Sequence, residues 1–293
     1  MPLRDILIAL VVIAVWGTNF VVIKYALGEL PPLLFACLRF TLVAFPAVFF
    51  LKRPAVPLRH LAAYGVLIGA GQFGLLYIAM THYISPGLAS LILQTQVVFT
   101  IGLSMLINGE KIGLYQIGAV LLAGAGVGVI ALHAQGSVTP LGLALCITAA
   151  ASWAGCNIVA RLAAQGGAGR INMLAYIVWS SLFSVPPLLA LSLFFEGPAA
   201  IGAGLAHLDA GVLAAVIWQS AGNTMFGFSL WAWLLARHPA ATVSPMALLI
   251  PVFGMGASAL LLNEPLQEWK LLAAGLVLGG LAVNFFWPLL RKR

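Results

Sequence analysis

Charged residues are scarce in this sequence. Lysine, arginine, aspartate and glutamate together make up 7% of its 293 residues, whereas about a quarter of a soluble domain is charged. Hydrophobic residues make up 62% of the chain. A globular core of this size could not hide that much apolar surface from water, so a soluble fold is excluded. The composition predicts an all-α integral membrane protein with no room for a domain outside the bilayer.

Cysteine is also scarce, and motifs that carry chemistry are missing. Cys37, Cys146 and Cys156 lie in apolar stretches without C-x-x-C spacing, so we expect no disulfide framework, no metal and no cofactor. The sequence has no H-E-x-x-H, G-x-S-x-G or aspartate-rich motif, and its five histidines fall in loops or at helix ends. We therefore expect no catalytic residues and no enzyme.

The net charge of +7 does not indicate a nucleic-acid partner. The basic residues form short clusters between apolar runs and do not line one continuous face, as a nucleic-acid site would require. The partners expected here are the lipid bilayer and a small-molecule substrate, with the protein a monomer or a weak homodimer.

Ten apolar stretches follow one another along the chain. Each is close to the roughly 20 residues that a helix needs to cross about 30 Å of hydrocarbon. A helical interpretation is required because lipid cannot satisfy the backbone of an open sheet. The stretches cover residues 6–27, 33–51, 61–80, 87–107, 114–132, 141–163, 171–195, 210–235, 240–262 and 271–290.

The basic residues predict the orientation of these helices. Counting loops alternately, one side collects Arg4, Lys52, Arg53, Arg59, Lys111, Arg161, Arg170, Arg237, Arg291, Lys292 and Arg293. The other side keeps Lys270 with Glu29, Glu196, Asp209, Glu264 and Glu268. Because positive loops stay inside, we expect a multi-pass protein of the inner (plasma) membrane with both termini in the cytoplasm.

The two halves of the chain repeat one another. Trp16-Gly17-Thr18-Asn19 is followed by Lys24, and Trp153-Ala154-Gly155-Cys156-Asn157 is followed by Arg161, with the basic residue eight positions after the tryptophan in both. Further along, residues 85–110 parallel residues 239–264. The matched pairs there are Ser90 with Ser244, Phe99 with Phe253, and Glu110 with Glu264.

This repeat predicts two units, residues 1–135 and residues 136–293, each with five crossings. Five is an odd number, so the second unit enters the membrane from the opposite side. Inverted repeats are typical of secondary transporters, in which the two halves exchange roles to open a central cavity to either side.

The paired tryptophan-containing helices, the loop ends Asn108-Gly109-Glu110 and Asn263-Glu264, and the five-plus-five plan resemble the drug/metabolite transporter superfamily. The resemblance is strongest to bacterial exporters with two EamA domains, and among them to the aromatic amino acid exporter branch. It covers essentially the whole chain. It implies export of amino acids or small metabolites through a central cavity lined mainly by helices one to four and six to nine.

Polar and aromatic side chains at membrane depth are the candidate substrate contacts. Buried amides and hydroxyls can bind both an ammonium and a carboxylate, and tryptophan can stack on an apolar side chain. The open alternatives are hydrogen bonds that only hold helices together, and ordinary packing. The candidates are Trp16, Asn19, Arg39, Tyr77, Gln94, Gln96, Trp153, Asn157, Gln219, Asn223 and Ser244.

Arg39 is the cationic candidate that lies deepest, about six residues inside its helix. It could bind a substrate carboxylate, pair with Glu29, or extend toward the membrane interface as Lys24 does. The predicted helix interiors contain no aspartate or glutamate, so no embedded carboxylate is available to exchange a proton for a cation.

These observations predict a secondary transporter that exports amino acids with apolar or aromatic side chains, or related metabolites, by alternating access. The alternatives are an exporter of lipophilic cations or drugs, and a carrier of the nucleotide-sugar type. A nucleotide-sugar carrier should need more embedded cations than Arg39 and Lys24 supply.

Overall fold

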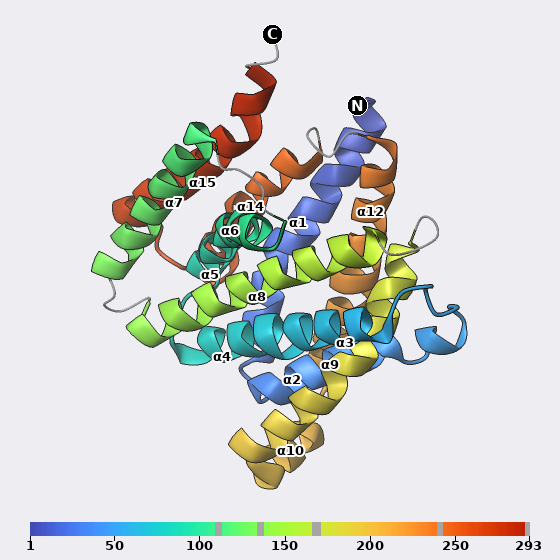
Figure 1. The fold of residues 1–293 in the computed structure, drawn as a ribbon. Helices are drawn as coiled ribbons and strands as arrows, with labels where there is room; N and C mark the ends of the chain where they lie inside the picture. Colours follow the sequence, from blue (N-terminus) through green and yellow to red (C-terminus); the bar gives the residue numbers. More distant parts are fainter. Residues whose placement is uncertain (109–112, 134–137, 166–170, 239–242, 291–293) are drawn as a thin grey trace.

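The structure is a computed structural model that describes residues 1–108, 113–133, 138–165, 171–238 and 243–290. These residues form a bundle of helices without a named β-strand (Figure 1). The elements of the first half are α1 (Leu3–Ala26), α2 (Pro32–Ala44), η1 (Ala47–Phe49), α3 (Leu58–Val66), η2 (Leu67–Gly74), α4 (Leu75–His82), α5 (Pro86–Ile92), η3 (Leu93–Thr95), α6 (Gln96–Asn108) and α7 (Leu114–Leu132). Those of the second half are α8 (Pro140–Gln165), α9 (Met173–Phe195), α10 (Gly197–Ala206), α11 (Ala210–Ile217), η4 (Trp218–Phe226), α12 (Gly227–Arg237), η5 (Ser244–Leu249), α14 (Ile250–Leu261) and α15 (Glu268–Leu290).

The all-α membrane fold is confirmed. Within the described residues, eight helical spans are long and apolar enough to cross a bilayer, and a ninth is formed if a bent pair is counted as one. The segment Met246–Leu261 is a shorter apolar helix. A membrane crossing by Met246–Leu261, and with it the total of ten crossings, therefore stays a prediction.

One helix, α10, lies in a stretch that the apolar pattern predicts as a loop. Gly197 has a φ of +80°, a conformation that glycine adopts without a steric penalty, and it ends the run of α9. Pro198 lies in the first turn of α10, a position that suits proline. The following span, Ala210–Leu234, is bent by 104° from α10, which lies at the opposite end of the bundle from both termini (Figure 1).

The two halves share irregularities as well as helices. The third long segment of each half contains a π-helical stretch, η2 in the first and η4 in the second. Both stretches carry an Ala-Gly-amide triplet, Ala70-Gly71-Gln72 and Ala221-Gly222-Asn223. The fourth segment of each half contains a 3₁₀ turn, η3 or η5. Such local departures from the α-helix often mark functional sites.

Helices of opposite halves pack against each other. Helix α1 of the first half packs along α14 of the second. Helix α8 of the second half packs along α6 of the first, and α7 pairs with α15. The contact between α1 and α14 depends on Gly17, where an added Cβ would lie 2.5 Å from Cβ of Phe253. Glycine permits this close approach of two helices in a membrane bundle. The arrangement places the middle of α1 beside segments from the other half.

Candidate functional site

A cavity of about 60 Å³ lies between helices of both halves. The polar side chains that line it come from α1, η2, α5, η3 and η4, so several helices contribute to one space. The lining residues are Trp16, Asn19, Phe20, Ile23, Gln72, Phe73, Leu76, Ser90, Leu93, Gln94, Trp153, Asn223, Phe228 and Ile250.

A second cavity continues the first. The two share Trp16, Gln94, Trp153, Phe228 and Ile250. From these residues the second cavity extends past Gln96, Thr100 and Asn157 to Arg161, Met173 and Phe285. Met173 begins α9, and Phe285 lies near the end of α15, the helix that leads to the C-terminus at the end of the bundle that holds both termini (Figure 1). The combined space, called the central cavity below, therefore reaches toward this terminal end.

Trp16 is held in place on one wall of the central cavity. Its indole Nε1 donates a hydrogen bond to the backbone oxygen of Asn223 at 3.1 Å. Its ring lies 5.3 Å, between centroids, from the rings of Phe228 and Trp231. Trp153 of α8 lines the same space. Two tryptophans from equivalent repeat positions thus give the cavity large apolar surfaces.

Asn19 and Gln219 close the inner part of the cavity. They donate hydrogen bonds to each other, and the phenol of Tyr77 donates a third to Oε1 of Gln219 at 3.3 Å. All three side chains are buried. Because every pairing joins different segments, these bonds connect α1, η4 and α4 across the repeat boundary.

Arg39 lies behind this floor and is fully buried. Its guanidinium donates to Oγ1 of Thr224 at 2.8 and 3.2 Å and to the phenol oxygen of Tyr77 at 2.8 Å. The proposed pairing of Arg39 with Glu29 is wrong, because Glu29 is exposed beyond the end of α1 while the guanidinium points into the bundle.

The wider part of the cavity has its own amide cluster. Asn157 donates to Oε1 of Gln96 at 2.8 Å and lies 3.3 Å from Oγ1 of Thr100. Gln94 donates to the backbone oxygen of Ala247 at 2.9 Å. These amides stand at different depths between the floor and the terminal end, so polar groups are available along the whole cavity.

The structure brings most of the candidate residues together. Trp16, Asn19, Gln94, Gln96, Trp153, Asn157 and Asn223 line the central cavity. Tyr77, Gln219 and Arg39 form the layer beneath it. The side chain of Ser244 lies outside the described part of the structure. Their binding of a substrate stays a prediction.

Three further residues lie in or beside the cavity and are not among the candidates predicted from the sequence. Phe73 and Phe228 wall the cavity as ordinary hydrophobic residues, so no sequence signal separates them from packing residues. Thr224 binds Arg39 although it directly follows Asn223, which faces the cavity. The two neighbouring side chains of η4 therefore have different partners.

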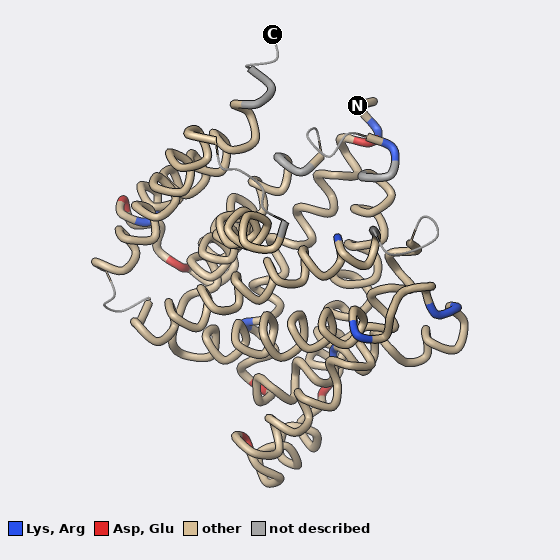
Figure 2. Tube along the Cα trace, viewed as in Figure 1, with Lys and Arg blue, Asp and Glu red and all other residues tan. Residues whose placement is uncertain are grey.

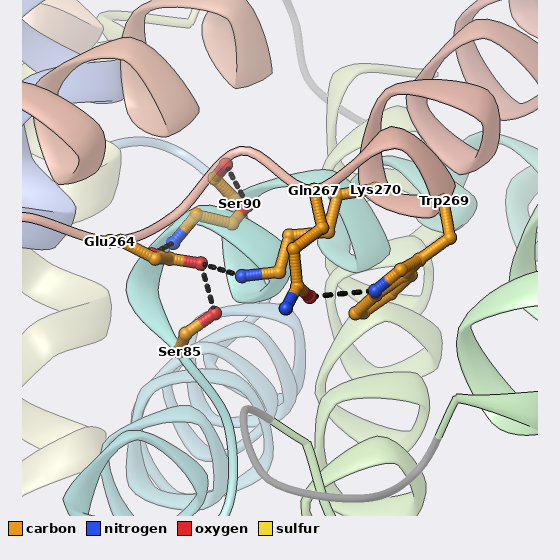
Figure 3. Close-up of polar contacts among 7 residues, drawn as sticks. Ser85, Ser90, Glu264, Gln267, Trp269 and Lys270 are labelled. Atoms are coloured by element: carbon orange, nitrogen blue, oxygen red, sulfur yellow. Dashed lines mark hydrogen bonds and ion pairs between the residues drawn. The ribbon is translucent and has the colours of Figure 1, made fainter.

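Polar contacts close the end of the bundle opposite the termini. The carboxylate of Glu264 accepts hydrogen bonds from the Ser85 hydroxyl and from the backbone N–H of Gly87, and it pairs with Lys270 at 3.0 Å (Figure 3). Lys24 donates to the backbone oxygens of Met80 and Thr81. The Glu264 contacts connect segments of both halves. This end of the bundle is called the closed end below.

Long apolar helices in two similar halves surround a cavity whose lining is mostly apolar with a few amides, a plan typical of multi-pass membrane transporters. The chain belongs to the EamA-like transporter family, which matches residues 3–132 and residues 140–286. The resemblance stated from the sequence is thereby confirmed.

Several known proteins are similar to this chain. It is 39% identical to the probable amino-acid metabolite efflux pump of Salmonella typhimurium, over 98% of this chain and 96% of that protein. It is 39% identical to the Escherichia coli K12 protein of the same description, over 100% of this chain and 98% of that protein. The uncharacterized inner membrane transporter YedA of Escherichia coli K12 is 32% identical over 60% of this chain and 59% of its own length. A solved structure at 18% identity covers 99% of both chains with a TM-score of 0.63, which shows a shared fold.

Proposed function

We propose that this protein exports amino acids with apolar or aromatic side chains from the cytoplasm by alternating access. The observation that carries the proposal is the composition of the central cavity. Amides of Asn19, Gln72, Gln94 and Asn223 supply donors and acceptors for the charged ends of a zwitterion. Trp16 and Trp153 supply apolar walls for its side chain.

The described cavity lining disfavours a cationic substrate, since it includes Arg161 and no carboxylate. Among the described residues, no aspartate or glutamate lines either part of the central cavity. A lipophilic cation would have to enter without a counter-ion, and an uncompensated charge at membrane depth is costly. A zwitterion carries its own counter-charge, so this cavity suits it better than it suits a cationic drug.

The charge distribution supports export as the direction. Figure 2 shows charged residues mainly near helix ends and loops, with long uncharged stretches of helix between them. Arg4 at the start of α1 and Arg237 at the end of α12 lie at the terminal end, where Asp5 and His238 pair at 2.6 Å. We infer that this end is cytoplasmic, in keeping with the positive-inside rule. The cavity would then be loaded from the cytoplasm.

The proposal includes the architecture expected from the sequence. Residues 1–135 and residues 136–293 would be two five-helix units of opposite orientation in the inner membrane, active without a catalytic residue or a cofactor. The similar efflux pumps of Salmonella typhimurium and Escherichia coli are named for amino-acid metabolites, which supports the same substrate class here. A monomer or a weak homodimer is the expected assembly.

Counterflow in liposomes tests this function. Vesicles with purified protein and unlabelled phenylalanine inside should accumulate labelled phenylalanine transiently, with no imposed pH difference, and empty vesicles should not. A carrier produces this overshoot and a channel does not. Uptake of a labelled lipophilic cation in place of the amino acid would overturn the proposal in favour of a drug exporter.

A further inference from the structure

Arg39 is a buried charge without a counter-charge. Its side chain is fully buried, in the interior of α2. Both groups that accept its hydrogen bonds, the Thr224 hydroxyl and the Tyr77 phenol, are neutral. Within the described part of the chain no aspartate or glutamate forms an ion pair with it. A burial of this kind is unfavourable unless something else compensates it.

Two ordinary explanations do not account for this position. Extension toward the lipid interface is excluded because the guanidinium is bound inside the bundle and no part of the residue is exposed. Cation–π contacts are present, with the guanidinium carbon 3.7 Å from the ring centre of Phe73 and 5.4 Å from that of Phe40. These rings stabilise a cation but bring no negative charge. An anion would be a stronger partner.

Two aromatic rings border both the central cavity and the space beside Arg39. Phe73 lines the cavity and also lines a small space, of about 10 Å³, that Arg39 and Thr224 border. Phe228 borders both spaces too. Phe73 belongs to the π-helical stretch η2, where the backbone hydrogen bonding departs from the regular α-helix. Phe73 is the ring that lies against the guanidinium, so its movement would expose Arg39 toward the cavity.

Arg39 is also linked to the central cavity by hydrogen bonds. It is seven residues from the start of α2, which is about 10 Å of helix. A continuous chain of hydrogen bonds leads to it from the cavity, from Asn19 to Gln219, Tyr77 and then Arg39. The guanidinium therefore belongs to the same polar network as the Asn19 amide of the cavity wall.

We propose that Arg39 binds the carboxylate of the transported molecule once the Phe73 ring has turned aside, an inference that rests on the proposed function. A guanidinium offers a planar pair of N–H donors that matches a carboxylate. The substrate oxygens would take the place of the Thr224 hydroxyl, while the substrate ammonium stays among the cavity amides. Arg39 is then the residue that selects amino acids over amines and amides of the same shape.

The test compares labelled L-phenylalanine with labelled L-phenylalaninamide, which keeps the side chain and the ammonium but lacks the carboxylate. The variants are Arg39→Gln and Arg39→Lys. Arg59→Gln is the matched control, because Arg59 is an exposed arginine at the start of α3. Counterflow in liposomes gives kcat and KM for both compounds with each protein.

For the wild type we expect kcat/KM to favour the amino acid by about tenfold to a hundredfold, the range of a charged, paired hydrogen bond. Arg39→Gln should bring this ratio close to one, mainly through KM of the amino acid, and Arg39→Lys should restore part of it. Arg59→Gln should leave the ratio unchanged. An Arg39→Gln protein with lower flux for both compounds and an unchanged ratio would show a structural role and overturn the proposal.

Phe73→Leu supplies a second test should Arg39→Gln fail to fold. Removing the ring should open the way to Arg39 and raise the preference for phenylalanine over its amide severalfold, and an unchanged preference would overturn the proposal. If the wild type moves neither compound, the proposed function itself is wrong. Wild-type transport with no carboxylate preference would instead overturn only the role of Arg39.

Discussion

Asn19 and Gln219 exchange two hydrogen bonds between helices of opposite halves, from Nδ2 of Asn19 to Oε1 of Gln219 at 3.2 Å and from Nε2 of Gln219 to Oδ1 of Asn19 at 2.8 Å. Both side chains are buried. Asn19 lines the central cavity, so this pair joins the two halves at the cavity wall. If the two halves move against each other in alternating access, this contact has to adjust.

The first prediction concerns the energy of this pair. Asn19→Ala and Gln219→Ala should each destabilise the protein, because each leaves a buried amide without its partner. In the double-mutant cycle, we expect a coupling free energy of about 1 kcal/mol, as found for hydrogen bonds between membrane helices. Reversible unfolding in mixed micelles measures it. Additive effects of the two substitutions would show that the pair contributes no specific coupling.

The second prediction concerns Trp153, which lines the central cavity. Trp153→Ala should raise KM for phenylalanine about threefold to tenfold by removing an aromatic contact, while KM for alanine changes less. Counterflow of both amino acids gives the comparison. Trp287→Ala is the control, since Trp287 is exposed and stacks on Tyr115 away from the cavity. Equal effects of Trp153→Ala on both substrates would indicate packing and not substrate contact.

The third prediction concerns the closed end. Glu264→Gln removes the ion pair with Lys270 and weakens the hydrogen bonds to Ser85 and Gly87. The state open on this side should become more populated, by about tenfold for a loss near 1.4 kcal/mol. A cysteine placed at Ile23, which lines the cavity, should then react faster with a membrane-impermeant reagent added on the side of the closed end.

The control for this experiment is Glu268→Gln, which makes the same change of charge at an exposed position nearby. The three native cysteines are buried and are replaced beforehand, so that the introduced cysteine is the reacting thiol. Equal labelling rates in Glu264→Gln and Glu268→Gln would mean that the Glu264 contacts do not hold this end closed.

Much of the fold could be predicted from the sequence because lipid imposes simple rules. A segment that crosses hydrocarbon must be long, apolar and helical, so the runs that became α1, α7, α8, α9 and α15 were visible at once. The same rules make polar residues at depth conspicuous. Asn19, Gln94, Asn157 and Asn223 were chosen for this reason, and they line one cavity.

The rest depends on contacts between helices, which the sequence does not display. Arg39 was placed at the right depth, but its partners Tyr77 and Thr224 come from segments far away in the chain. The π-helical stretches η2 and η4 shift side chains relative to the regular 3.6-residue period that guides such predictions. The short helix α10 falls in a stretch that the apolar pattern predicts as a loop, because the helix is too short to cross the membrane.

The last prediction concerns orientation, on which the direction of transport depends. The segment between η1 and α3 carries Lys52 and Arg53, and the first turn of α3 carries Arg59, whereas α10 lies at the end of the bundle opposite the termini (Figure 1). Because positive loops stay in the cytoplasm, a cysteine at Ala55 should react only after the membrane of intact cells is made permeable. A cysteine at Ala200 of α10 should react in intact cells. The reverse pattern would mean that the central cavity of this structure opens to the outside. Export from the cytoplasm would then have to start from the alternative conformation, in which the cavity opens to the cytoplasm.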